Sequence, residues 1–191
     1  MLLKTLPYFS FRYDVDFLLT KQPVLHHLYW RAAFYTHISF SIIVLLIGGF
    51  QFSKYLIYNK QKFHRLLGKT YVILVLCICA PSGFIMAIHA NGGFWARLSF
   101  SLTSLLWWLF TFLAYRCVIK KELSKHMGFM VRSYALTLSA ISLRLLVMLL
   151  PHIADLHGKE MYVTVAWLSW VPNLLVAELM IRPLLRSYRL L

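Results

Sequence analysis

The chain has 191 residues, of which 60% are hydrophobic and 16% are aromatic, and its formal net charge is +14 at pH 7. A soluble domain is nearer to half apolar, so this composition argues against a soluble protein and indicates one compact helical domain in a membrane. The basic residues lie in short loops between apolar runs, which is the positive-inside pattern of membrane proteins and argues against a nucleic-acid-binding surface.

The first 30 residues, 1–30, precede the apolar runs and are predicted to form an extracytoplasmic leader. They contain no continuous apolar core followed by small residues, so they are not a cleavable signal peptide. Within them, Phe9–Leu19 mixes aromatic residues with Arg12, Asp14 and Asp16, which suits a segment lying along the membrane interface. A loosely ordered leader is the alternative.

Five apolar runs follow, and each is as long as the roughly 20 residues that a helix needs to cross a bilayer. The connections between them are short, so neighbouring spans should be antiparallel. We therefore predict an all-α integral membrane protein: a bundle of five transmembrane helices in residues 31–182, followed by a basic tail at 183–191. The spans are expected at about 31–52, 66–89, 94–118, 127–150 and 161–181.

The charge of the loops predicts the orientation of the bundle. Loops 53–65 and 119–126 carry four and three Lys or Arg residues, whereas loop 90–93 carries none and loop 151–160 carries one. Cytoplasmic loops hold the excess of positive charge in membrane proteins. The N-terminus is therefore predicted outside and the C-terminus in the cytoplasm.

Polar residues within the spans fall on single helical faces, which should turn inward because polar groups facing lipid are costly. His64 and His89 are 25 residues apart, about seven turns, so they are expected on one face of the second span. His126 and Arg144 are 18 residues apart, about five turns, so they are likewise expected on one face of the fourth span. Small and hydroxyl residues between them favour close helix packing, and such stripes are also typical of any packed membrane bundle.

Depth along the helices predicts an outer cluster of polar side chains. His37 lies about 9 Å below the outer end of the first span, and Arg144 lies at a similar depth in the fourth. His89 closes the second span on the same side. The loops above this cluster contain Asn91, His152 and His157.

An inner cluster is predicted at the opposite ends of the spans. Glu178 in the fifth span lies near the level of Arg132, and a lone charge at that depth is costly, so these two residues are predicted to form an ion pair. The inner cluster consists of Gln51, His64, Arg65, His126 and Arg132.

Three stretches of the sequence carry a resemblance to a known family. They are FYTHISFSIIVLLIGGFQF, FHRLLGKTYV and SKHMGFMVRSYALTLSAISLR. The chain from about Asp16 to Arg144 resembles a large family of predicted bacterial multi-pass membrane proteins that is defined as a domain of unknown function. The resemblance implies a protein of the bacterial cytoplasmic (inner) membrane and supplies no activity. Such proteins often carry a further apolar segment before DFLLTK, which this chain lacks.

The histidines suggest a specific function. Two facing imidazoles are the usual axial ligands of a b-type haem, and arginines pair with its propionates, so we expect haem b and a redox or electron-transfer role. The candidate pairs are His37 with His89 and His64 with His126. The two histidines of the second span are about 37 Å apart along the helix, which is long for electron transfer between two haems. A single haem near His37 is therefore the preferred hypothesis.

Other functions remain open. Inward polar stripes and an intramembrane arginine also suit the binding or transport of a quinone, an anionic lipid or a small anion. The chain would otherwise be a non-catalytic subunit of a larger membrane complex, with its aromatic residues in partner contacts. Two histidines with His152 or Asp155 would suit a divalent metal. No hydrolase or phosphate-loop motif occurs, and the sequence does not decide whether the protein is an enzyme.

Overall fold

The structure, a computed structural model, describes residues 6–10, 12 and 14–189, and within this part the chain is mainly helical and contains no strand. The predictions for the leader and the basic tail fall partly on residues 1–5, 11, 13, 190 and 191, which lie outside the described residues.

Within the described part, five helical stretches are long and apolar enough to cross a membrane. This confirms the prediction of an all-α membrane protein with five spans. The spans are α3 (Leu28–Gln51), the continuous α5, η3 and α6 (Gln61–Leu74, Val75–Cys79 and Ala80–Ile88), α7 (Phe94–Ile119), α8 (Leu123–Ile153), and α9 with α10 (Gly158–Leu168 and Val171–Arg189).

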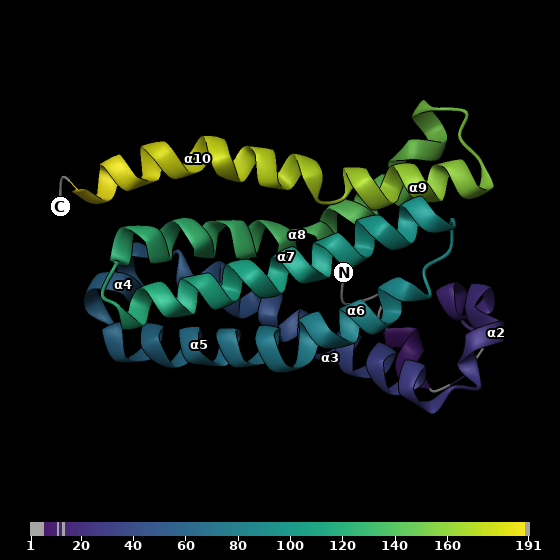
Figure 1. Ribbon diagram of the computed structural model, residues 1–191, viewed down its shortest axis with the longest axis horizontal. Coiled ribbons are helices and arrows are strands. Elements are labelled where there is room, and N and C mark those ends of the chain that lie inside the picture. Colours follow the sequence, from purple (N-terminus) through teal and green to yellow (C-terminus); the bar gives the residue numbers. More distant parts are fainter. Residues whose placement is uncertain (1–5, 11, 13, 190–191) are drawn as a thin grey trace.

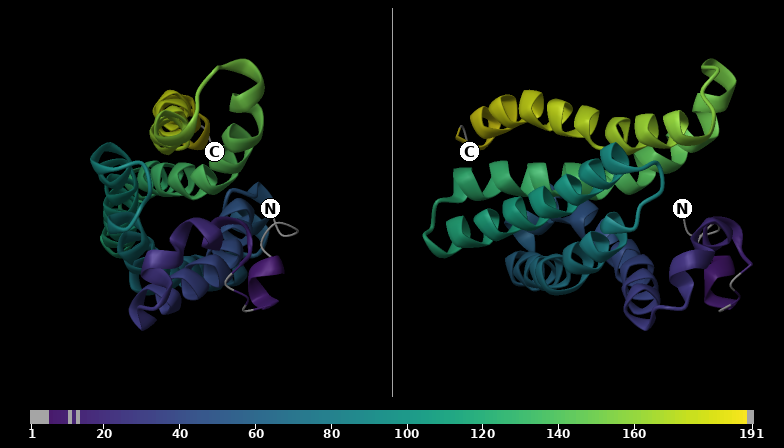
Figure 2. Two further views of the ribbon diagram at one scale, coloured as in Figure 1. Left: turned by 90° about the vertical axis from the view of Figure 1, so that its right-hand side faces the viewer. Right: turned by 45° about the vertical axis from the view of Figure 1, so that its right-hand side comes forward.

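The helices lie roughly parallel to one long axis (Figures 1 and 2). Helices α7 and α8 pack together in the middle, with α3, α5 and α6 on one side and α9 and α10 on the other. One end holds α2 (Gln22–Leu25) and the α6–α7 loop, and the opposite end holds α4 (Lys54–Asn59) and the α7–α8 turn. We call them the α2 end and the α4 end. The predicted outer cluster belongs to the α2 end, and which end faces outward stays a prediction.

The described part of the leader packs against the start of α3. Leu18 and Trp30 are fully buried, and Leu25 and Phe34 complete the same apolar cluster. This segment is therefore part of the packed α2 end. Besides α2, it contains the short helices η1 (Leu6–Ser10) and η2 (Asp16–Lys21).

A network of buried hydroxyl groups joins three spans at the centre of the bundle. The Tyr71 hydroxyl lies 2.9 Å from Ser133 Oγ and 2.9 Å from Thr137 Oγ1, and Thr111 Oγ1 lies 2.7 Å from Ser133 Oγ. Tyr71 belongs to α5, Thr111 to α7 and the other two residues to α8. Hydrocarbon offers no hydrogen-bond partner, so these hydroxyls stabilise the bundle by satisfying one another.

Two of the spans are interrupted. The second span contains a π-turn at Val75–Cys79, shortly before Pro81. The fifth span, predicted as one apolar run, is divided between α9 and α10. Asn173 bridges this break, because its Nδ2 donates to the carbonyl oxygens of Ser169 at 3.1 Å and of Ala135 on α8 at 3.3 Å. Non-helical backbone at membrane depth is tolerated where protein satisfies it in this way.

Gly48 allows α3 to approach the centre of the bundle. A Cβ atom there would lie 2.5 Å from the ring of Tyr134 and 3.0 Å from the ring of Tyr71. Both rings are held by their hydroxyls, Tyr134 by a 3.2 Å hydrogen bond to the Leu45 carbonyl. We expect Gly48→Ala to destabilise the protein by about 1–3 kcal/mol through overpacking. This loss should outweigh the gain of about 1 kcal/mol in helix propensity.

Thermal unfolding in detergent, followed by tryptophan fluorescence, measures this effect. The matched control is Gly128→Ala, where the nearest atom to the added Cβ would be 3.5 Å away, an ordinary contact. An unfolding temperature for Gly48→Ala at or above that of the wild type would contradict the proposed close packing.

Candidate functional site

His37 lies inside the bundle and contacts the interrupted second span. Its Nδ1 atom is 2.9 Å from the carbonyl oxygen of Cys79 and 3.3 Å from Ser82 Oγ. A carbonyl oxygen only accepts, so Nδ1 carries a hydrogen and donates it, which leaves a lone pair on Nε2 of the neutral ring. A Cβ atom at Gly83 would lie 3.0 Å from His37 Cε1, so glycine is what lets α6 lie this close to the ring.

Arg144 lies at a depth similar to that of His37. Arg144 is nine residues before the end of α8 at Ile153, and His37 is nine residues after the start of α3 at Leu28. Nine residues of helix span about 13 Å. The guanidinium donates to the Ala140 carbonyl on its own helix at 2.8 Å, and it lies within electrostatic range of His37. Among the side chains that the structure describes, no carboxylate pairs with Arg144.

His89, the third member of the predicted outer cluster, has a different neighbour. Its Nε2 atom is 3.0 Å from the hydroxyl of Tyr29, which precedes His37 by eight residues, about 12 Å along α3. The structure therefore does not bring His37 and His89 together. A π-turn adds a residue to one helical turn, so the seven-turn spacing between His64 and His89 does not keep them on one face.

The loop residues form no metal-binding cluster within the described chain. No three His, Cys, Asp or Glu side chains there lie together as metal ligands would. Asp155 and His157 approach each other to 3.4 Å, and both are almost fully exposed. Among the loop residues predicted for a divalent metal, the structure therefore shows one contact, between the exposed side chains of Asp155 and His157.

Three members of the predicted inner cluster meet at the α4 end. Gln51 is buried, and its amide hydrogen bonds are satisfied when Nε2 donates to His64 Nδ1 at 3.0 Å and Oε1 accepts from the Gly68 N–H at 3.2 Å. His126 lies within electrostatic range of His64, and its Nδ1 donates to the Ala114 carbonyl at 2.9 Å.

These bonds give the two inner imidazoles opposite tautomers. Neutral His64 accepts at Nδ1 and therefore carries its hydrogen on Nε2, whereas neutral His126 carries it on Nδ1. Two axial ligands of one iron need lone pairs on both Nε2 atoms, so His64 would have to change tautomer to act with His126. Arg65 stands apart, because its Nε donates to the Gln61 carbonyl of its own helix.

Arg132 and Glu178 form a bidentate ion pair between α8 and α10. The two hydrogen bonds measure 2.5 Å from Nε to Oε1 and 2.7 Å from Nη2 to Oε2. The guanidinium also lies over the ring of Phe129, 5.5 Å from its centre. Parallel bonds of this kind are the strongest form of charged hydrogen bond and fix the orientation of both partners.

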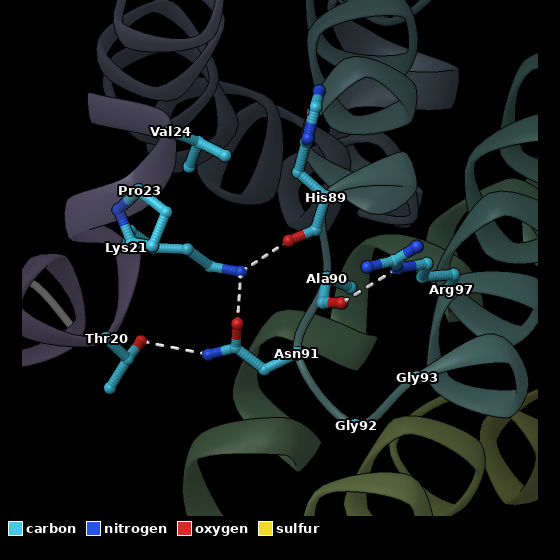
Figure 3. A pocket seen from close by; sticks show the side chains of 10 residues that line it. All are labelled: Thr20, Lys21, Pro23, Val24, His89, Ala90, Asn91, Gly92, Gly93 and Arg97. Carbon is cyan, nitrogen blue, oxygen red and sulfur yellow. Dashed lines mark hydrogen bonds between the residues drawn. The ribbon is translucent and has the colours of Figure 1, made fainter. Parts of the chain in front are cut away.

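A pocket at the α2 end contains two cations that sequence reasoning did not single out. Lys21 is 2% exposed, and Arg97 lies on the first turn of α7 (Figure 3). Burial, together with the nearby charge of Arg97, lowers the pKa of Lys21 to about 8. The sequence offered only part of the signal: Arg97 follows loop 90–93, which carries no Lys or Arg, whereas no spacing in the sequence places Lys21 beside it.

Comparison with known proteins identifies the family of the chain. A family model described as a predicted membrane protein, DUF2306, matches residues 34–181, and the chain belongs to this family. The resemblance noted in the sequence is thereby confirmed. Searches of the curated proteins and of the solved structures found no significant match.

The Arg132–Glu178 pair should stabilise the packing of α10 on α8. We expect Arg132→Ala to lower the yield of folded, monodisperse protein more than Lys120→Ala, an exposed lysine at the same end. Removing one partner leaves the other charge unpaired in the membrane. A double-mutant cycle with Glu178→Ala, read by thermal unfolding, should give a coupling energy on the order of 1 kcal/mol. A coupling energy near zero would show that the pair does not stabilise the fold.

Lys21 should make stability depend on pH. Its pKa is about 8 in the folded protein and about 10.4 in an unfolded chain. Between these values the unfolded chain binds more protons, so the stability of the fold rises with pH. In phosphate-free buffer, we expect the unfolding temperature of the wild type to rise from about pH 7.5 to pH 10 relative to that of Lys21→Met. Parallel pH profiles for the two proteins would show that Lys21 is not a buried cation.

Proposed function

We propose that this member of the DUF2306 family binds a lipid-soluble ligand with an oxygen-rich head between α3 and α8, in contact with Arg144 and His37. The observation that carries the proposal is the charge of Arg144 within a membrane span, which no carboxylate among the described side chains balances. A charged side chain there is costly, and such residues usually face a partner or a ligand. The proposal is a binding role and assigns no reaction.

The two side chains define the chemistry of the head group. The guanidinium of Arg144 donates hydrogen bonds and carries positive charge, so it favours an anionic oxygen, or a carbonyl oxygen as the weaker choice. His37 offers the lone pair of Nε2 and therefore accepts from a hydroxyl. An acidic lipid with a hydroxylated head satisfies both residues, and a quinol satisfies them without balancing the charge. The acidic lipid is thus the leading candidate and the quinone pool the second.

Haem b remains an alternative occupant. In its favour, His37 and His126 each donate Nδ1–H to a backbone carbonyl, as metal-ligating histidines commonly do. Against it, His37 and His89 have different neighbours, and His64 has the other tautomer from His126. A redox role, a place in the bacterial inner membrane and a role as subunit of a larger complex stay predictions.

Analysis of what the purified protein carries tests the proposal. The protein is extracted in mild detergent, and bound lipids and quinones are identified by mass spectrometry after solvent extraction. An absorption spectrum before and after dithionite tests for haem in the same sample. Loss of a hydrogen bond to a charged group is worth about 1.5–3 kcal/mol, so Arg144→Gln should reduce the bound acidic lipid at least roughly tenfold.

Arg116→Gln is the matched control, because Arg116 is an exposed arginine near the far end of α7. Its bound lipid should equal that of the wild type. Equal retention of every lipid and quinone by Arg144→Gln would rule the proposal out. A Soret band lost in His37→Ala would transfer the function to haem binding.

A further inference from the structure

The pocket at the α2 end is separate from the Arg144 site. It has a volume of about 340 Å³ and lies between the segment Thr20–Val24, the α6–α7 loop and the first turn of α7 (Figure 3). Its ten lining residues include two cations and no Asp or Glu. A cavity of this size accommodates a small ligand or the head of a larger one.

Lys21 is held in the pocket by neutral groups. Its Nζ atom donates to the His89 carbonyl oxygen at 2.5 Å and to Asn91 Oδ1 at 2.7 Å. Asn91 is fixed in turn, because its Nδ2 donates to Thr20 Oγ1 at 3.0 Å. These bonds position the ammonium group without neutralising it, and burying an unneutralised charge is costly. Among the side chains that the structure describes, no anion completes this arrangement.

Arg97 lies close to Lys21, and a third cation, Lys159, lies beside the α6–α7 loop at Gly93. Arg97 donates from Nε to the Ala90 carbonyl at 3.3 Å, and its charge acts on Lys21. Lys159 approaches the same loop from the start of α9, where its Nζ lies 3.3 Å from the position that a Cβ atom at Gly93 would occupy. Among the described residues none of these three cations pairs with a carboxylate. Positive charge from three elements thus converges on one loop.

The backbone where this loop enters α7 adds further positive charge beside the cations. Gly92 and Gly93 have φ values of 85° and 77°, which favour glycine, and Gly93 precedes α7 without a side-chain cap. The first N–H groups of a helix lack partners within it and carry partial positive charge. The 26-residue helix α7 therefore presents its positive end beside the cations.

We infer that this pocket binds a phosphate-type oxyanion. Two clustered cations, with a third at the loop, match the charge of a phosphate dianion better than that of a single carboxylate. The tetrahedral arrangement of phosphate oxygens also suits donors that approach from two sides, Lys21 from the leader and Arg97 from the first turn of α7. Exposed Phe94 and Trp95 adjoin the pocket, as aromatic residues do at the level of lipid head groups. The phosphate is either a free anion or the head of a membrane lipid.

Thermal unfolding of the full-length protein in detergent tests binding of the free anion. The probe is inorganic phosphate, compared with chloride at equal ionic strength. At a concentration about ten times the dissociation constant, phosphate should raise the unfolding temperature by roughly 3 °C. The rise should disappear in Lys21→Met and Arg97→Gln and persist in Lys62→Gln, an exposed lysine at the α4 end. Arg97→Gln keeps the hydrogen bonds of Lys21, so it remains informative if Lys21→Met does not fold.

A second arm tests the lipid source. The protein is reconstituted in nanodiscs of phosphatidylcholine with and without phosphatidic acid, and retained lipid is counted by native mass spectrometry. A response to both probes, or to phosphatidic acid alone, identifies a lipid head group, and a response to inorganic phosphate alone identifies a free anion. Either result supports the site if Arg97→Gln abolishes it. No response to either probe, or a response that both pocket variants retain, overturns the inference.

Discussion

Hydrocarbon offers no hydrogen-bond partner, and this constraint determines where the polar side chains of the bundle lie. The Tyr71 hydroxyl reaches the two α8 hydroxyls at the point where three spans meet. The carbonyls of the π-turn region accept hydrogen bonds from the side chains of Trp108, His37 and Ser82. Most of these hydrogen bonds join two helices, and the bond from Ser82 lies at the π-turn. The same bonds therefore satisfy the polar groups and hold the helices together.

Two arginines of helix α8 satisfy their hydrogen bonds in different ways, one with a carboxylate and one with a backbone carbonyl. Arg132 is balanced by Glu178, and the ion pair ties α10 to the bundle. Arg144 lies twelve residues further along the same helix, about 18 Å, and has a backbone carbonyl and a nearby imidazole in place of a carboxylate. The same residue type on one helix thus forms an ion pair at one level and, in our proposal, contacts a ligand at another. The buried ammonium of Lys21 repeats the second situation outside the spans.

Features that depend on the length of an apolar run, or on the depth of a residue along a span, were predictable from the sequence. Apolar runs located the five spans, because the thickness of a bilayer fixes the number of residues that cross it. The rise per residue placed Arg132 and Glu178 at one level, and the structure pairs them. Direction around a helix was less predictable, because the π-turn changes the rotation between His64 and His89. The pocket was not predictable from spacing, because Lys21 and the Asn91 that it contacts are 70 residues apart in the chain.

Two parts of the chain line the pocket, and only one of them lies within the residues that the family model matches. Arg97 and the α6–α7 loop lie within the matched residues 34–181, whereas Lys21 lies in the segment before them. A substitution of Lys21 would therefore change the proposed oxyanion site while leaving every residue of the matched region as it is.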